Sequence, residues 1–261
     1  MRIVRFTPGP DAGLGQDPLF GVLEDDGVIS IIGGDPIYSG IQKTAATIPL
    51  NKVRLLAPII PRSKVVCVGK NYADHAAEMG GVVPEEPIIF LKPNTSVIGP
   101  NDTIVWPEMS ERVDHEAELA IVIGRICKDV PKERVNDVIF GYTIANDVTA
   151  RDLQKKDGQW TRAKGFDTFC PIGPWIDTDF VPGTQKITAT IAGEVKQSAQ
   201  ISDMIFDVPT IINFVSRVMT LLPGDVILTG TPAGIGPMVA GEKATMAIEG
   251  LGELTNKLSA R

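Results

Sequence analysis

Two glutamates at alternate positions, Glu116 and Glu118, stand directly before the apolar run 119–123 in "VDHEAELAIVIG". If this segment is a strand, side chains two residues apart point to the same face, with Cα atoms about 6.6 Å apart. Carboxylates that close repel each other, and burying them unpaired is unfavourable. A bound divalent cation removes both problems, and hard oxygen ligands favour Mg²⁺, Ca²⁺ or Mn²⁺ over zinc. The alternative is an exposed carboxylate pair on a sheet edge.

A third carboxylate, Asp147, lies in "GYTIANDVTARD", where an expected strand gives way to an expected helix. Asp147 is therefore a candidate third ligand. The alternative is that its side chain caps the helix that follows, as aspartate often does.

A histidine and a glutamate stand three residues apart in "VVCVGKNYADHAAEMGG". On a helix, His75 and Glu78 share one face, and a carboxylate beside histidine orients the ring and raises its basicity. The pair is a candidate general acid–base group. Because the chain has only 2 histidines, any histidine chemistry rests on His75 or His115. The alternative is a surface helix with an incidental pair.

Two further segments carry polar groups that could contact an anion. Lys164 lies in "QWTRAKGFDTFCPIGPW", and Thr229 and Thr231 lie in the glycine-rich "LLPGDVILTGTPAGIGP". Lys164 could hold an anionic substrate or stabilise an enolate, although most lysines are solvated. The glycines of the second segment allow close backbone approach to a ligand, but the segment matches neither a P-loop nor a dinucleotide-binding turn.

Short β-rich runs separated by glycine (26) and proline (20) make up most of the chain. Helical patterns are few: "NYADHAAEM", "TARDLQKK" and "VPTIINFVSRVM". The proline-punctuated "LAPIIPRSK" predicts a boundary near residue 58. We therefore expect a mostly β protein with some α, with a small N-terminal β domain over 1–58 and a larger domain over 59–261.

Composition excludes several classes of protein. An apolar fraction of 43% with 22% charged residues is that of a soluble globular protein, and a net charge of −7 argues against nucleic-acid binding. We find no apolar run long enough to span a membrane and no secretory signal in "MRIVRFTPGPDAG". The 3 cysteines are widely spaced and form no CxxC, which suits free thiols in a reducing cytoplasm.

Taken together, the motifs "GKNYADHAAEMG", "DHEAELAIVIG", "GYTIANDVTARDLQ", "AKGFDTFCPIGP" and "GDVILTGTPAGIG" occur in an order that resembles the fumarylacetoacetate hydrolase family. The resemblance covers roughly residues 60–255. It looks closest to the short members: acylpyruvases, oxaloacetate decarboxylases and hydroxyheptadienedioate isomerases. It implies a mixed β-roll catalytic domain, a small N-terminal domain, a homodimer and a Mg²⁺ or Mn²⁺ site.

The resemblance also implies roles for individual residues. The paired glutamates of this chain match two metal ligands of the family, and the strand-end aspartate matches the third. The lysine of this chain matches one that stands beside the metal in the family. The histidine–glutamate pair matches the acid–base dyad of the family, and other motif residues match its substrate contacts. At one of these positions, in a turn, the family commonly has Arg where this chain has Lys70. The matched residues are Glu116, Glu118 and Asp147 (metal), His75, Glu78 and Lys164 (catalysis), and Lys70, Tyr72, Arg151, Gln154 and Thr231 (substrate).

These roles imply a metal-dependent enzyme that acts on 2-oxo acids through a metal-stabilised enolate. The expected reaction is C–C bond hydrolysis of acylpyruvates or decarboxylation of oxaloacetate. A close alternative is a 2-hydroxyhepta-2,4-diene-1,7-dioate isomerase or decarboxylase, and an alternative of another class is a catalytically silent metal-binding scaffold. We expect a small-molecule 2-oxo acid and a second copy of the chain as partners, and neither nucleic acid nor membrane.

Overall fold

Runs of β-branched residues separated by glycine and proline turns fold into three sheets with short helices between them. The structure, a computed structural model, describes residues 1–78 and 80–260. The fold class is the one that the sequence predicts, mostly β with some α. Among the described helices, none is long and apolar enough to cross a membrane.

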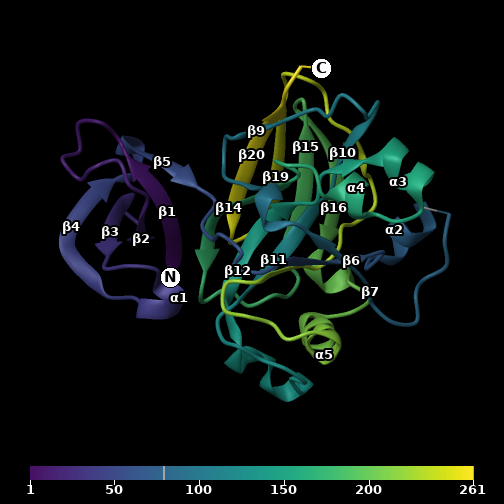
Figure 1. The fold of residues 1–261 in the computed structure, drawn as a ribbon, viewed down its shortest axis with the longest axis horizontal. Coiled ribbons are helices and arrows are strands. Elements are labelled where there is room, and N and C mark those ends of the chain that lie inside the picture. Colours follow the sequence, from purple (N-terminus) through teal and green to yellow (C-terminus); the bar gives the residue numbers. More distant parts are fainter. Residues whose placement is uncertain (79, 261) are drawn as a thin grey trace.

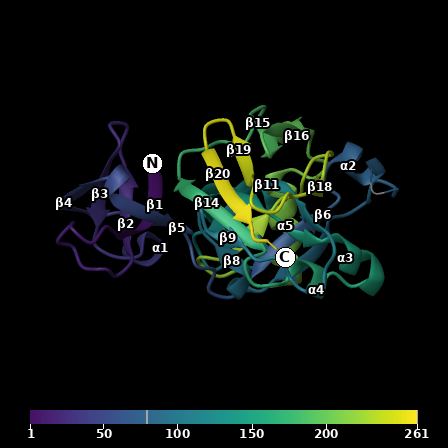
Figure 2. The same cartoon turned by 90° about the horizontal axis from the view of Figure 1, so that it is seen from above.

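The N-terminal strands form a lobe at one end of the molecule, at the left of Figures 1 and 2. Pairing within the lobe is antiparallel, and the strands are β1 (Arg2–Pro8), β2 (Leu19–Leu23), β3 (Val28–Ile32), β4 (Lys43–Pro49) and β5 (Val53–Leu56), with a short helix α1 (Pro36–Ser39). Strand β1 also pairs with β14 (Cys170–Asp177) in the main body, so one sheet runs through both regions. Independent folding of 1–58 stays a prediction.

The centre of the large sheet is β11 (Ala117–Ile123), in which every residue is buried. It is flanked by β12 (Ile139–Asn146) and β17 (Val226–Leu228), and β17 pairs in parallel with β6 (Val65–Gly69). Leu119 and Ile121 pack into one core cluster and Ala120 and Val122 into another, so both faces of the strand are covered. The sheet is completed by β7 (Ile88–Lys92) and β8 (Val97–Ile98).

A second sheet packs against this centre and shares its larger core cluster. Its strands are, in order, β16 (Glu194–Gln200), β15 (Lys186–Ile191), β19 (Lys243–Ile248), β20 (Gly252–Leu258) and β9 (Thr103–Ile104). A third, small sheet joins β13 (Thr149–Ala150), β10 (Val113–His115) and β18 (Gly236–Pro237). It brings the segments before β11, after β12 and after β17 to one place.

Of the remaining helices, three lie close to their predicted positions, and the one at Thr161–Lys164 was not predicted. These remaining helices are α2 (Ala73–Glu78), α3 (Arg151–Asp157), α4 (Thr161–Lys164) and α5 (Val208–Val218), with 3₁₀ turns η1 (Leu50–Lys52), η2 (Asn94–Ser96), η3 (Lys132–Asp137) and η4 (Ile201–Asp203). The expected helix over "TARDLQKK" begins two residues late, at Arg151, because Thr149 and Ala150 pair with β10 instead.

Candidate metal centre

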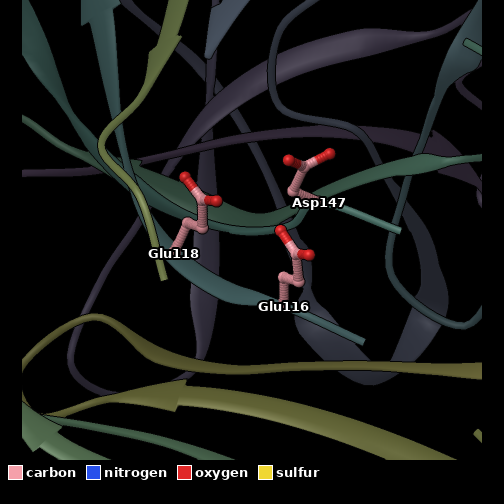
Figure 3. A group of neighbouring side chains, drawn as sticks. All are labelled: Glu116, Glu118 and Asp147. Carbon is pink, nitrogen blue, oxygen red and sulfur yellow. The ribbon is translucent and has the colours of Figure 1, made fainter. Parts of the chain in front are cut away.

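Three buried carboxylates converge at the edge of the large sheet. Glu118 is the second residue of β11, Glu116 lies in the break between β10 and β11, and Asp147 directly follows β12. One carboxylate oxygen from each lies within 4.8 Å of the others, and Figure 3 shows the three groups pointing toward a common space. The hydrogen bond from the Asp147 amide to the Glu116 carbonyl, 2.9 Å long, fixes the two backbones side by side.

Two alternatives from the sequence are excluded by this geometry. The glutamates are not on an exposed edge, because Glu116 and Glu118 are 4% and 1% exposed. Asp147 does not cap α3, because the cap position is held by Ala150. The cluster instead has the composition that suits a hard divalent cation, three carboxylates that offer oxygen ligands.

Three buried cations surround the cluster. Lys164 Nζ donates to Glu116 Oε2 at 2.8 Å and to Asp147 Oδ2 at 2.6 Å, and Lys92 Nζ donates to Asp147 Oδ1 at 2.6 Å. Arg151 donates to Glu116 Oε1 and, through Nε at 2.9 Å, to Asp114. These pairs compensate much of the charge that burial would otherwise disfavour.

Glu116 and Glu118 differ in their electrostatics. Burial acts to raise the pKa of Glu116, but the charges of Lys164 and Arg151 outweigh it, so this pKa falls well below its usual range. Burial raises the pKa of Glu118 well above its usual range, and the charges of Asp147 and Glu116 add to the effect. Within the described chain, the Glu118 carboxylate accepts only the Gly230 amide, at 2.6 Å, and has no cation partner. Glu118 is thus the carboxylate that a metal ion would neutralise.

The His75–Glu78 pair faces the same cavity. His75 Nδ1 lies 3.2 Å from Glu78 Oε2, and Glu78 also accepts the Gly234 amide at 3.2 Å. Because a carboxylate only accepts, Nδ1 carries the ring hydrogen and Nε2 is left free to exchange a proton. The pair is formed in this structure.

The cavity combines a charged floor with an aromatic wall. Phe90 and Trp160 pack edge to face, 5.1 Å between ring centres, and Lys164 Nζ lies 5.2 Å from the Phe90 ring centre. Nine of the eleven sequence-predicted site residues line this cavity. The lining residues are Val68, Gly69, Lys70, His75, Phe90, Glu116, Glu118, Asp147, Arg151, Gln154, Trp160, Lys164 and Thr231.

Two of the predicted site residues lie outside this lining. Tyr72 borders a different pocket, with Asp74 and Asp203, and its hydroxyl has no hydrogen-bond partner among the described residues. Glu78 reaches the cavity only through His75. His115 is fully buried behind the cluster and contacts Gln197, so the histidine that faces the cavity is His75.

The loop after β17 closes one side of the cavity. Gly230 has a φ of +97°, and a Cβ there would meet Asn71 Cβ at 2.6 Å, so only glycine fits against the turn that leads to α2. Its amide holds Glu118, while that of Gly234 holds Glu78. One loop therefore orients both a candidate ligand and the partner of the candidate base.

Sequence reasoning missed three residues of the site. Lys92 ends a strand of otherwise apolar residues, and a charge in that position was the available signal. Phe90 and Trp160 form the aromatic wall but carry no spacing pattern that marks them.

Two family models cover this chain. The model described as fumarylacetoacetate (FAA) hydrolase C-terminal matches residues 64–259, and one described as Rv2993c-like, N-terminal, matches residues 1–58. "Protein Rv2993c" of Mycobacterium tuberculosis is 58% identical over 226 residues, which cover 85% of this chain and 83% of that protein.

Two further similar proteins carry functional names. "Oxaloacetate tautomerase FAHD2A, mitochondrial" of Bos taurus is 40% identical, with 99% of this chain and 91% of that protein covered. The solved structure of 2-hydroxyhepta-2,4-diene-1,7-dioate isomerase from Mycobacterium marinum is 49% identical, with a TM-score of 0.88, over 99% of this chain and 98% of that chain.

Proposed function

The chain belongs to the fumarylacetoacetate hydrolase family, and we propose that it is a divalent-cation-dependent enzyme that moves a proton at the carbon next to the 2-oxo group of small 2-oxo acids. The observation that carries the proposal is a base opposite a ligand cluster: His75, oriented by Glu78, faces the same cavity as the three carboxylates. We propose oxaloacetate as the reference substrate, since several relatives are named oxaloacetate tautomerases.

The donor set fits Mg²⁺ or Mn²⁺, with Glu116, Glu118 and Asp147 as ligands. When bound, such an ion would supply Lewis-acid polarisation of the 2-oxo group. Four carboxylates and four cations gather in this region, so the charges of these eight groups balance when all are ionised. They are Glu116, Glu118, Asp147 and Asp114 against Lys92, Lys164, Arg151 and Arg112. A divalent ion would leave two positive charges, which suits a dianionic acid.

Each protein group then has a separate task. His75 Nε2 removes a proton from, or returns it to, the carbon beside the 2-oxo group, and Glu78 stabilises the charged ring. Gln154 Oε1 accepts from Arg151 Nη1 at 2.6 Å, which leaves its amide hydrogens available to carboxylate oxygens in the cavity. Lys164 offsets negative charge on the floor. Lys70, on a turn with a φ of +57°, supplies a further cation at the cavity wall.

The same dyad supports a second candidate function, C–C bond hydrolysis of acylpyruvates, because an oriented histidine can also activate water. Decarboxylation of oxaloacetate and isomerisation of a heptadienedioate acid use the same cavity without that water. A panel of 2-oxo acids assayed with Mg²⁺, Mn²⁺ and EDTA separates these reactions. We expect proton transfer on oxaloacetate to be the fastest. Metal binding without turnover of any acid would refute the proposal and favour a scaffold.

We also propose a homodimer, on the family resemblance alone. Light scattering at micromolar concentration is expected to give twice the chain mass of 28.0 kDa. A mass of one chain would contradict it.

A further inference from the structure

A buried glutamine outside the cavity connects three parts of the site. Gln197 is the only buried residue of β16, a strand described in full, and its neighbours Lys196 and Ser198 are exposed. Its amide makes hydrogen bonds on both sides: Oε1 to the Ala117 amide at 2.9 Å, and Nε2 to Pro232 O and Thr231 Oγ1, each at 2.7 Å. Such a group on an otherwise exposed strand calls for a role beyond core packing.

The partners fix which way the amide faces. The Pro232 carbonyl can only accept, so the Gln197 NH₂ group must face it, and the Ala117 amide can only donate, so Oε1 must face the other way. The two requirements agree, and no flipped amide satisfies either. Both hydrogens of the Gln197 NH₂ group are then used, one by Pro232 and one by Thr231.

This orientation determines the direction of the Thr231 hydroxyl. Because the Thr231 oxygen accepts from Gln197, its own hydrogen must point elsewhere. No acceptor for it exists among the described protein groups, and Thr231 lines the cavity. We propose that Gln197 is a positioning residue that makes Thr231 a hydrogen-bond donor to an anionic oxygen of the substrate. The nature of that anion rests on the proposed function.

Strand β16 also supports the loop that carries Thr231. Gly234 has a φ of +96°, and a Cβ there would lie 2.0 Å from the Lys196 carbonyl, so the loop rests directly on the strand beside Gln197. The Gly234 amide in turn holds Glu78. At the other end, the Ala117 amide bound by Gln197 lies between the two glutamates of the cluster. Gln197 thus holds the donor Thr231 at a fixed place relative to the ligands.

The same geometry fixes the hydrogen on a buried histidine. His115 Nδ1 lies 3.2 Å from Gln197 Oε1, an acceptor, so the ring hydrogen is on Nδ1. Within the described structure, His115 Nε2 has no partner. The position of this hydrogen therefore reports the orientation of the Gln197 amide in a way that needs no substrate.

The test is a double-mutant cycle on the binding of oxalate, a planar dianion that copies the adjacent oxygens of a 2-oxo acid, at saturating Mg²⁺. Thr231→Val and Gln197→Met should each weaken oxalate binding by roughly 10-fold or more, as loss of a hydrogen bond to a charged group does. The double variant should bind oxalate no more weakly than Thr231→Val, because Gln197 acts through that hydroxyl. Gln200→Met, an exposed glutamine on the same strand, is the matched control and should change nothing.

Three results would overturn the inference. They are a double variant in which the two losses of oxalate affinity multiply, an unchanged oxalate affinity in Gln197→Met, and no oxalate binding by the unaltered protein. If Gln197→Met does not fold, nitrogen-15 NMR of the unaltered protein decides, with His75→Asn used to assign the two histidines. A hydrogen on His115 Nδ1 supports the proposed orientation, and one on Nε2 alone refutes it. Neither measurement needs turnover. If the protein turns over no 2-oxo acid but the double-mutant cycle shows that Gln197 acts through Thr231, the proposed function is refuted and this inference stands.

Discussion

The ammonium group of Lys92 lies 2.6 Å from Oδ1 of Asp147, and neither side chain is more than 1% exposed. Lys164 donates to the other oxygen of the same carboxylate, so two buried cations fix the position of Asp147. Breaking a buried pair by removing one partner typically costs about 3–5 kcal/mol, because it leaves an uncompensated charge.

Lys92→Met should therefore lower the free energy of unfolding of the metal-free protein by about 3–5 kcal/mol. Added Mn²⁺ should recover part of the loss, because the cation neutralises Asp147. Urea unfolding in EDTA and in Mn²⁺ measures both effects. Lys155→Met, on the exposed side of α3, is the control. A change of less than about 1 kcal/mol for Lys92→Met would show that the pair contributes nothing net.

Glu118→Gln should remove metal binding without unfolding the protein. The amide keeps the size of the side chain and can still accept the Gly230 amide, but it removes a charge that has no cation partner. Mn²⁺ affinity measured by calorimetry should fall by more than 100-fold, while the unfolding midpoint in EDTA at pH 7 should stay the same or rise. A large loss of stability in EDTA would mean that the Glu118 charge is compensated without metal.

Metal binding should release a proton from Glu118 at pH values below the raised pKa of this group in the metal-free protein. Its pKa in the metal-free protein is raised, so the folded form keeps a proton that the unfolded chain loses near pH 4.5. Above that pH, the stability of the metal-free protein should fall as pH rises toward the folded pKa, and Mn²⁺ should abolish this fall. Calorimetry in two buffers of different ionisation enthalpy measures the released proton. Equal enthalpies would contradict the assignment.

Gly69→Ala should disturb the aromatic wall. A Cβ at this position would lie 2.8 Å from the Trp160 indole, which must then shift against Phe90. We expect KM for oxaloacetate to rise about 10-fold, since one badly placed wall residue affects substrate more than metal. Mn²⁺ affinity should be unchanged. Gly33→Ala, where a Cβ meets nothing within 4 Å, is the matched control. An unchanged KM would place Trp160 away from the substrate.

The ligand cluster could be predicted from sequence because its members stand at strand ends in short local patterns. Alternation made Glu116 and Glu118 candidates, and a place after a strand did the same for Asp147, but only the family resemblance favoured their interpretation as ligands over the alternatives. The fold class followed from the spacing of β-rich runs and turns. The three predicted helices were also close to the observed ones, except where pairing with β10 drew Thr149 and Ala150 into a strand, whereas α1 and α4 were not predicted.

The groups that complete the site could not be predicted, because they reach it through sheet pairing between distant segments. Lys92 meets Asp147 across 55 positions of sequence, and Gln197 meets Ala117 across 80. Gln197 is not unusual in its local sequence, and for Lys92 the one local signal is its charge at the end of an apolar strand. Tyr72 shows the opposite case: it stands beside the predicted dyad in sequence, yet its side chain borders a different pocket. For predicting which residues line the site, a position at the end of a strand was therefore more informative than proximity to other site residues along the chain.

The most direct measurement of the central claim is the rate at which enol oxaloacetate converts to the keto form, followed by the loss of enol ultraviolet absorbance. With Mg²⁺, the unaltered protein should accelerate this conversion, and His75→Asn should lose about 10²–10⁴-fold of the acceleration while it binds Mn²⁺ with normal affinity. EDTA should abolish the acceleration in both proteins. Equal rates for His75→Asn and the unaltered protein, or acceleration that persists in EDTA, would contradict a metal-dependent proton transfer by His75.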